Sequence, residues 1–152
     1  ISYMNQQTLY FAYGSNLNHQ QMKSRCPGSK YIKNYYLPGY KLSFSWKPTR
    51  RQSTGVANIV KKAGSKVPGT IYKINSKDRE QLRIHEGYYR NVYDEKFFLL
   101  NKKKILYYIM NKGFILKRPS KDYVKIVKRG YEDRNLDIDI LRRRLSHYRM
   151  KI

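Results

Sequence analysis

Residues 10–17 read Tyr-Phe-Ala-Tyr-Gly-Ser-Asn-Leu, an apolar and aromatic run that breaks into three residues favoured in turns. Gly14 supplies backbone freedom, and Ser15 and Asn16 can cap nearby backbone donors. A buried strand ending in such a turn exposes backbone N–H groups at the edge of a core, where they can bind a carboxylate or a developing oxyanion. The same residues also fit an ordinary strand end before a helix capped by Asn16 or Asn18, which is the commoner case.

Glu86 is the carboxylate best suited to proton transfer. It ends a predicted helix directly before Gly87, and Leu82 lies one turn earlier on the same face, so Glu86 points toward the apolar side. Partial desolvation raises the pKa of a carboxyl group and suits it to general acid/base work. A helix C-terminus also disfavours negative charge, and local rules tend to be broken at functional sites. The alternative is a solvated glutamate at a helix end.

Other candidate nucleophiles and metal ligands are weak. The chain contains no convincing Ser-His-Asp or Cys-His set, so we interpret Ser15 as a loop and hydrogen-bonding residue. The single cysteine, Cys26, is interpreted as structural; it cannot form an internal disulfide, which favours a reducing, cytoplasmic location. His19, His85 and His147 do not match metal-ligand spacing, so no metal site is expected.

The elements that must position these residues follow from hydrophobic patterning and turn signals. Four helices are expected: residues 18–25; a helix capped by Ser76 that runs through Glu86; one from Pro119-Ser120 to about Glu132; and one over residues 137–149. The expected strands are Tyr31–Leu37 and Tyr40–Trp46, joined as a hairpin at Pro38-Gly39; Val56–Lys62 and Val67–Ile74, separated by Ala63-Gly64-Ser65; and Tyr93–Leu100 and Ile105–Met110.

This order is not a regular βαβ alternation, which argues against a doubly wound sheet. We expect an α+β fold, a small mixed β-barrel or strongly curved sheet with flanking helices. The 152 residues fit one domain, 1–152, in which residues 1–4 are left out of the fold argument because Met4 could be the native start. No apolar run approaches the roughly 20 residues that span a bilayer, and no signal peptide is seen, so no membrane partner is expected.

The formal net charge of +23 is extreme and unevenly distributed. The first 77 residues hold no Asp or Glu against 13 Lys and Arg, and the remaining 75 hold all 10 carboxylates with 20 basic residues. Such a surface attracts nucleic acid, anionic lipid or acidic metabolites. The competing explanation of the positive charge is the composition of a proteome rich in Lys, Asn, Ile and Tyr, encoded by an AT-rich genome. The dispersed distribution of the basic residues favours this explanation.

Four segments make the chain similar to the gamma-glutamylcyclotransferase-like family. They occur in the family's order and approximate spacing over nearly the whole chain. They are Tyr10–Leu17; Arg25–Gly28 through Leu37–Phe44; Val67–Tyr72 leading to Leu82…Glu86-Gly87; and Pro119–Tyr123 followed by Gly130 and Leu136. The resemblance implies a compact barrel with flanking helices and a cavity at the barrel.

The resemblance also implies site residues. Glu86 takes the position of the family's proton-transfer glutamate. The residues implied to bind the gamma-glutamyl group are Tyr10, Phe11, Ala12, Tyr13, Gly14, Ser15, Asn16, Leu17 and Tyr123. The chain departs from the family at His85, where Gln or Phe is common, and in the short aromatic stretch Tyr88–Arg90; both leave substrate choice open.

The implied activity is that of a cyclising lyase or acyltransferase. The substrate's α-amine attacks its own γ-amide carbonyl and releases 5-oxoproline, so neither an enzyme nucleophile nor a cofactor is needed. Relatives of this fold act on gamma-glutamyl amino acids, on gamma-glutamyl-lysine isopeptides or on gamma-glutamyl groups used for protection, and the sequence does not choose among these small molecules. A homodimer is expected only by analogy. The alternative function is a basic module that binds nucleic acid or another anionic surface on the same scaffold.

Overall fold

The computed structural model describes residues 6–48, 54–110 and 112–152, so Ile1–Met4 lie outside the described residues. The strands are β1 (Gln7–Ala12), β2 (Lys30–Trp46), β3 (Val56–Asn75), β4 (Tyr93–Leu100), β5 (Lys103–Met110) and β6 (Ile115–Leu116). The helices are α1 (His19–Arg25), α2 (Ser76–His85), α3 (Lys121–Arg134) and α4 (Ile138–Ser146), with short 3₁₀ turns at Ser15–Leu17 and Tyr88–Arg90.

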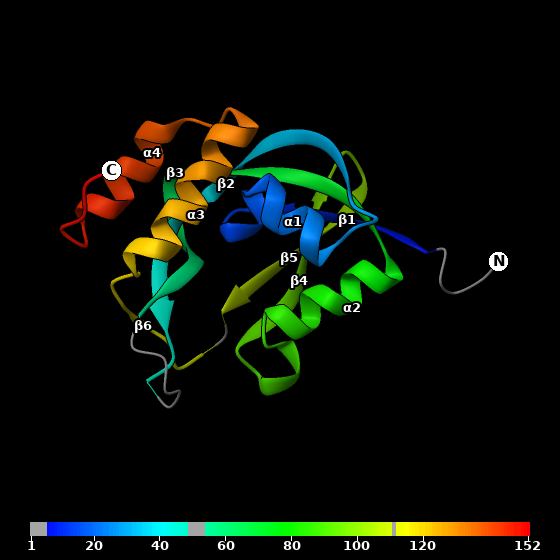
Figure 1. The fold of residues 1–152 in the computed structure, drawn as a ribbon, viewed down its shortest axis with the longest axis horizontal. Coiled ribbons are helices and arrows are strands. Elements are labelled where there is room, and N and C mark those ends of the chain that lie inside the picture. The colour runs from blue at the N-terminus through cyan, green and yellow to red at the C-terminus, as the bar shows by residue number, and fades with distance from the viewer. Residues whose placement is uncertain (1–5, 49–53, 111) are drawn as a thin grey trace.

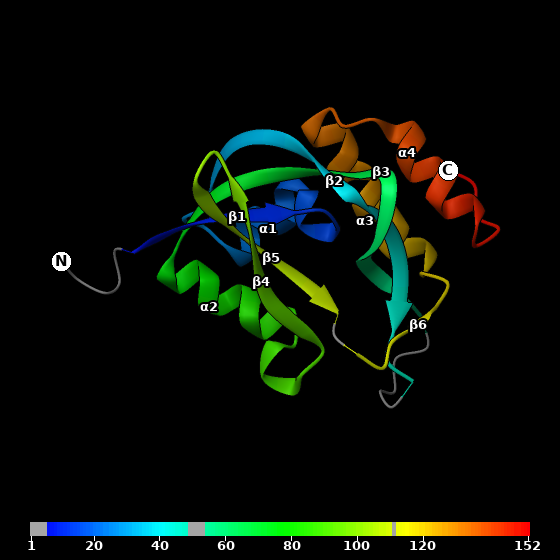
Figure 2. The ribbon, with the colours of Figure 1, turned by 180° about the vertical axis from the view of Figure 1, so that it is seen from behind.

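The strands form one mixed sheet in the order β4-β5-β1-β3-β2-β6. β1 pairs antiparallel with β3 and parallel with β5, so the first strand of the chain lies in the middle of the sheet. The sheet curls into a half-barrel; α1, α2 and α3 lie in front of it in Figure 1, and the strands come to the front when the molecule is seen from behind in Figure 2. The expected α+β fold with a strongly curved sheet and flanking helices is confirmed.

The predicted hairpin turn at Pro38-Gly39 is wrong, and so is the predicted separation of two strands at Ala63-Gly64-Ser65. β2 and β3 are each continuous through these positions and pair antiparallel over most of their length. The pairing register shifts between Pro38 and Tyr40, and Gly39 and Gly64 both have positive φ (81° and 82°) there. The glycines therefore form a bulge that bends the two-stranded ribbon, because a bulge needs the same backbone freedom as a turn. The chain reverses instead between Trp46 and Val56.

The helix ends follow local capping chemistry. The side chains of Asn18, Ser120 and Asp137 accept hydrogen bonds from backbone N–H groups in the first turns of α1, α3 and α4. The expected cap Ser76 of α2 is wrong by one residue. Asn75 caps α2, and its side chain accepts from the N–H of Asp78 while the Asp78 carboxylate accepts from the N–H of Asn75. This reciprocal pair satisfies two backbone N–H groups that have no partner within the helix, whereas a serine cap one residue later would satisfy one.

The core lies between the curled sheet and the helices. Phe11 of β1 is fully buried, as are Leu17 in the turn after β1 and Tyr131 of α3. Gly130 of α3 approaches this turn so closely that a Cβ there would lie 2.6 Å from the Cβ of Leu17. The contact fixes α3 against the end of β1. Among the helices of the described residues, none combines the length and apolar character of a bilayer span.

Candidate functional site

A cavity of about 200 Å³ opens at the end of β1. The turn after β1, the end of α2, Tyr123 of α3 and residues of β3, β4 and β5 form its wall. Most residues predicted for the site lie in that wall. These are Tyr10, Phe11, Tyr13, Gly14, Ser15, Asn16, Glu86 and Tyr123.

Two predicted residues, Ala12 and Leu17, are not part of the cavity wall. Ala12 is buried in β1, where it pairs with Thr70 of β3. Leu17 is buried in the core against Gly130. Both residues hold the turn in place from behind and leave the turn itself, residues 13–16, to face the cavity.

The turn after β1 presents backbone donors. The N–H of Leu17 donates to the carbonyl of Gly14 at 3.1 Å, and that of Asn18 donates to the carbonyl of Ser15 at 3.0 Å. Within the described chain, no backbone hydrogen bond uses the N–H of Ser15 or Asn16, since they begin the 3₁₀ turn. Two N–H groups in the turn are therefore available to a bound anion or carbonyl oxygen.

Gly14 allows this turn to pack tightly. A Cβ at Gly14 would lie 2.8 Å from the Cβ of Ala57 and 3.3 Å from the hydroxyl oxygen of Tyr123. The position therefore requires glycine for close approach, because any side chain would displace the turn from β3 and α3. The turn was predicted from the flexibility of glycine, whereas the structure adds this steric reason.

A polar network holds Asn16. The Arg25 guanidinium donates to Asn16 Oδ1 at 3.0 Å, and Asn16 Nδ2 donates to the hydroxyl of Tyr10 at 3.1 Å. The hydroxyl of Tyr72 donates to the backbone carbonyl of Asn16 at 3.0 Å. Gln21 also donates to Asn16 Oδ1 at 3.1 Å. Four residues thus fix Asn16 by hydrogen bonds, and its side chain orients the turn.

The Ser15 hydroxyl accepts a hydrogen bond of 2.6 Å from Gln21 Nε2. Among the described residues, no hydrogen bond joins Ser15 to a histidine. The side chain therefore lacks the general base that activates a serine nucleophile. This environment supports its interpretation as a hydrogen-bonding residue of the loop.

Glu86 caps the C-terminus of α2, where its N–H donates to the carbonyl of Leu82 at 2.8 Å. Its carboxylate forms no hydrogen bond with any of the described residues, and it retains intermediate exposure because it faces the cavity. Desolvation raises the pKa of Glu86 to about 7, and the positive charge of Arg25 opposes this rise. A carboxyl group with this pKa can both accept and donate a proton near neutrality.

Tyrosines surround the carboxylate. Burial raises the pKa of Tyr10, Tyr13, Tyr93 and Tyr108 well above the ordinary value and that of Tyr123 to about 12, and the charge of Glu86 contributes in every case. The five phenols are therefore neutral at physiological pH. They make the wall polar without adding a second anion beside Glu86.

The phenol hydroxyls are held by the backbone and by one carboxylate. Tyr13 donates to the carbonyl of Tyr108 at 2.6 Å, and Tyr93 donates to the carbonyl of Ala57. The N–H of Ala57 donates to the Tyr123 hydroxyl at 3.0 Å. Tyr108 donates to Glu95 at 2.8 Å. These bonds fix the rings, so the cavity is preformed.

Sequence reasoning missed several residues of the wall. Arg25 follows a short helix and Tyr93 begins a strand, and nothing in their spacing relates them to the turn after β1. His85 also contributes to the wall although it is largely exposed, and burial together with Arg25 lowers its pKa. The wall residues without an assigned site role in the sequence analysis are Arg25, Trp46, Val56, Ala57, His85, Gly87, Arg90, Val92, Tyr93 and Tyr108.

In the described chain, no three His, Cys, Asp or Glu side chains come together in a way that could hold a metal ion. The charged residues of the cavity wall are Glu86, Arg25 and Arg90, with His85 at the edge of the same helix end. The wall therefore offers one carboxylate for proton transfer and two guanidinium groups that attract anions.

The chain is thus a small α+β protein that combines a curled mixed sheet with a tyrosine-lined cavity, a carboxylate of raised pKa and unengaged backbone N–H groups. Such a site can hold a small polar molecule beside a proton-transfer group. The chain belongs to the family Gamma-glutamyl cyclotransferase, AIG2-like, whose sequence profile matches residues 10–132. The resemblance inferred from the sequence is thereby confirmed.

Curated relatives support this assignment. The chain is 29% identical over 139 residues to gamma-glutamylcyclotransferase of Homo sapiens. The matched region covers 86% of this chain and 73% of the relative. It is 29% identical over 136 residues to gamma-glutamylcyclotransferase of Mus musculus, covering 84% and 72%. A solved structure of a gamma-glutamyl cyclotransferase superimposes with a TM-score of 0.76 at 26% identity over 88% of this chain and 83% of that one.

Proposed function

We propose that this protein is a gamma-glutamyl cyclotransferase that releases 5-oxoproline from a gamma-glutamyl amide, with Glu86 as the general acid/base. The observation that carries the proposal is the position of Glu86. Its carboxylate lies in the same cavity wall as the Tyr13–Asn16 turn, has no hydrogen-bond partner among the described residues, and has a pKa raised to about 7. The name of the family and of its relatives supports the reaction class.

The turn after β1 would bind the gamma-glutamyl group. The N–H groups of Ser15 and Asn16 are oriented by the hydrogen bonds to Asn16 and can receive the α-carboxylate or the developing oxyanion. Each donor to an oxyanion contributes about 10²–10³ to the rate. The neutral hydroxyl of Tyr123 is a further candidate contact with the glutamyl carboxylate.

The chemical step is intramolecular. Ionised Glu86 accepts a proton from the substrate's α-ammonium, and the free amine attacks the γ-carbonyl carbon to form the new C–N bond of the five-membered ring. Protonated Glu86 then donates that proton to the leaving nitrogen as the original amide C–N bond breaks, which regenerates the carboxylate. The ring nitrogen loses its second proton to this carboxylate, which passes it to the released amine, so the products are a neutral lactam and an ammonium ion. Orienting the amine toward the carbonyl supplies effective molarities of about 10⁵–10⁸ M, so positioning contributes more than proton transfer, at about 10²–10⁴.

The test is direct measurement of 5-oxoproline from purified protein with gamma-glutamyl amino acids, a gamma-glutamyl-lysine isopeptide and a gamma-glutamyl tripeptide. We expect release from at least one compound together with a stoichiometric amount of free amine. Release of glutamate instead would mean that water is the nucleophile and would contradict the cyclising mechanism. No turnover of any compound would contradict the proposal.

A cytoplasmic location is part of the proposal. Cys26 is a buried free thiol, and burial raises its pKa to about 12. A thiol of this kind is structural and persists in a reducing compartment. Cell fractionation tests the location, and recovery of the protein in an oxidising compartment would contradict it.

A further inference from the structure

A hollow of about 500 Å³ lies between α3 and the C-terminal segment, on a part of the surface that shares no lining residue with the cavity of Glu86. Its floor is apolar and includes Val124 and Met150, both buried. Its other lining residues include six cations, and no Asp or Glu belongs to the lining. The six are Arg118, Lys121, Lys125, Lys128, Arg149 and Lys151.

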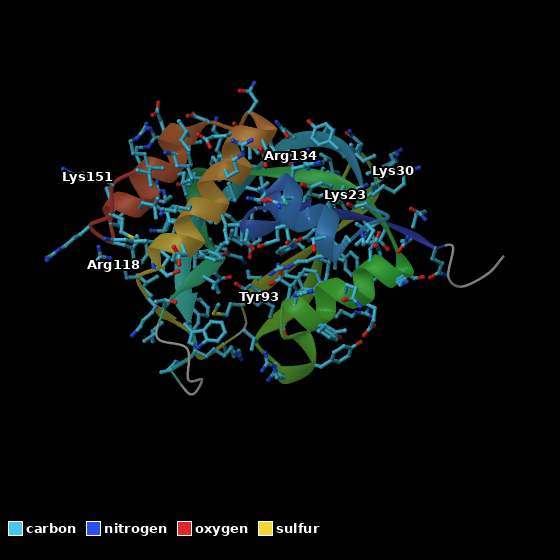
Figure 3. All side chains as sticks on the ribbon, in the orientation of Figure 1. Lys23, Lys30, Tyr93, Arg118, Arg134 and Lys151 are labelled. Carbon is cyan, nitrogen blue, oxygen red and sulfur yellow. The ribbon has the colours of Figure 1, made fainter. Side chains whose placement is uncertain are left out.

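A second hollow of about 380 Å³ adjoins the first at Arg118, which lines both. Lys41, Lys117 and Arg144 add three more cations, and no Asp or Glu lines this hollow. The two hollows together are called the basic groove. Figure 3 shows Arg118 and Lys151 on the same side of the molecule.

The cations of the basic groove are not neutralised. Of the ion pairs between described residues, none includes any of these nine Lys and Arg side chains. Other cations of the same helices are paired, since Arg129 bonds Asp133 at 2.9 Å and Arg142 pairs with Asp139. Nine cations thus line two adjoining hollows whose lining contains no acidic residue, an arrangement that attracts a polyanion.

Helix α3 separates the basic groove from the cavity. Lys121, Lys125 and Lys128 follow the i, i+4, i+7 spacing of one helix face. Successive cations along this face are about 4.5–6 Å apart in rise, because each residue adds about 1.5 Å. Tyr123 points from a different face into the cavity wall. One helix therefore carries a line of charges outward and a cavity residue inward.

We propose that the basic groove binds the phosphate backbone of a single-stranded nucleic acid. A groove that is lined with cations and has an apolar floor suits a narrow, flexible polyanion, whose phosphates meet the Lys and Arg while sugars and bases cover Val124 and Met150. A bilayer surface is flat and contacts protruding residues, so it would leave the concave floor unused. This site is independent of the reaction proposed above.

The test is fluorescence anisotropy with a labelled oligouridylate of about 20 nucleotides, titrated at several salt concentrations. The wild-type affinity is expected to fall steeply with salt. The variant Lys121→Gln/Lys125→Gln/Lys128→Gln removes three phosphate contacts, which lowers the slope of log K against log salt by about 2 and weakens binding about 100-fold at 0.1 M salt. A second variant, Arg118→Gln/Lys151→Gln, changes two residues outside the helices and is expected to lower the slope of log K against log salt by about 1.4. It keeps the proposal testable if the α3 variant does not fold.

The matched control is Lys23→Gln/Lys30→Gln/Lys33→Gln, which removes the same charge. Lys23 and Lys30 lie on the opposite side of the molecule from Arg118 and Lys151 in Figure 3. The control is expected to bind within a few-fold of wild type, and both groove variants are expected to retain the wild-type melting temperature and any 5-oxoproline release. Equal loss in the control would show diffuse charge attraction and overturn the proposal. The proposal would also be overturned if the protein did not bind oligouridylate but did bind vesicles of phosphatidylcholine and phosphatidylserine.

Discussion

The guanidinium of Arg25 donates a hydrogen bond of 3.0 Å to the side-chain oxygen of Asn16, and it does so from the wall of the cavity that also contains Glu86. Arg25 therefore acts on two parts of the site. It orients the turn through Asn16, and its positive charge lowers the pKa of Glu86 against the rise caused by burial. The two effects can be separated experimentally because, in the proposed mechanism, the turn binds the substrate and Glu86 transfers the proton.

Replacing Arg25 by Gln is expected to move the pH dependence of kcat/KM. In the proposed mechanism the free enzyme needs ionised Glu86, so kcat/KM is expected to rise with pH through an apparent pKa of about 7. Without the positive charge the pKa of Glu86 rises further, and the acidic limb of the profile shifts to higher pH. KM also rises because Asn16 loses a partner. Lys23→Gln, on the same helix, is the control and leaves the limb in place; an unmoved limb in Arg25→Gln would refute the electrostatic role.

Much of the fold follows from local sequence signals. Asn18, Ser120 and Asp137 predict helix starts because capping is a short-range interaction. Gly39 and Gly64 misled the prediction, since positive φ is needed by turns and bulges alike and only the long-range pairing of β2 with β3 tells them apart. Sequence separation is what limits the prediction.

The same limit applies to the site. Glu86 was predicted from its helix end and the turn from its residue types, both local patterns. Arg25 and Tyr93 reach the cavity only through the packing of α1 and β4 around β1, and no spacing in the chain encodes that. The resemblance to a family identified Tyr123. Its hydroxyl accepts a hydrogen bond from the N–H of Ala57, which lies 66 residues earlier in the chain.

Glu86→Gln tests proton transfer. The amide has the size of the carboxyl group but cannot exchange the proton, so kcat is expected to fall by about 10²–10⁴ with little change in KM. The assay is initial-rate release of 5-oxoproline. Glu80→Gln, on the exposed face of the same helix, is the matched control and keeps wild-type turnover. A Glu86→Gln variant within a few-fold of wild type would remove Glu86 from the mechanism.

The same variant makes a prediction about stability. Folding raises the pKa of Glu86 from 4.5 to about 7, so the unfolded chain releases its proton first and wild-type stability falls as pH rises through that window. Gln imitates the protonated form at every pH. We expect the melting temperature of Glu86→Gln to exceed that of wild type at about pH 8 and to converge with it toward about pH 4. A difference that does not change with pH would contradict the raised pKa.

Gly14→Ala tests the close packing of the turn. The new Cβ would lie 2.8 Å from the Cβ of Ala57, so the turn or β3 must shift. Overpacking of this kind costs about 1–3 kcal/mol, and both the melting temperature and kcat/KM are expected to fall. Ala57→Gly removes the opposing methyl group. In a double-mutant cycle the pair is expected to lose less than the sum of the single variants, and strict additivity would argue against the contact.

Gly130→Ala tests whether α3 is held against the turn by the absence of a side chain. In an exposed helix this change stabilises by about 1 kcal/mol, because alanine has the higher helix propensity. Here the Cβ would lie 2.6 Å from the Cβ of Leu17 and 2.7 Å from the backbone nitrogen of Asn18, and neither the buried leucine nor the backbone can move aside. We therefore expect the opposite sign, a lower melting temperature, with reduced kcat/KM because Tyr123 moves with α3. A higher melting temperature would show that propensity outweighs the contact and that α3 can shift without disturbing the cavity.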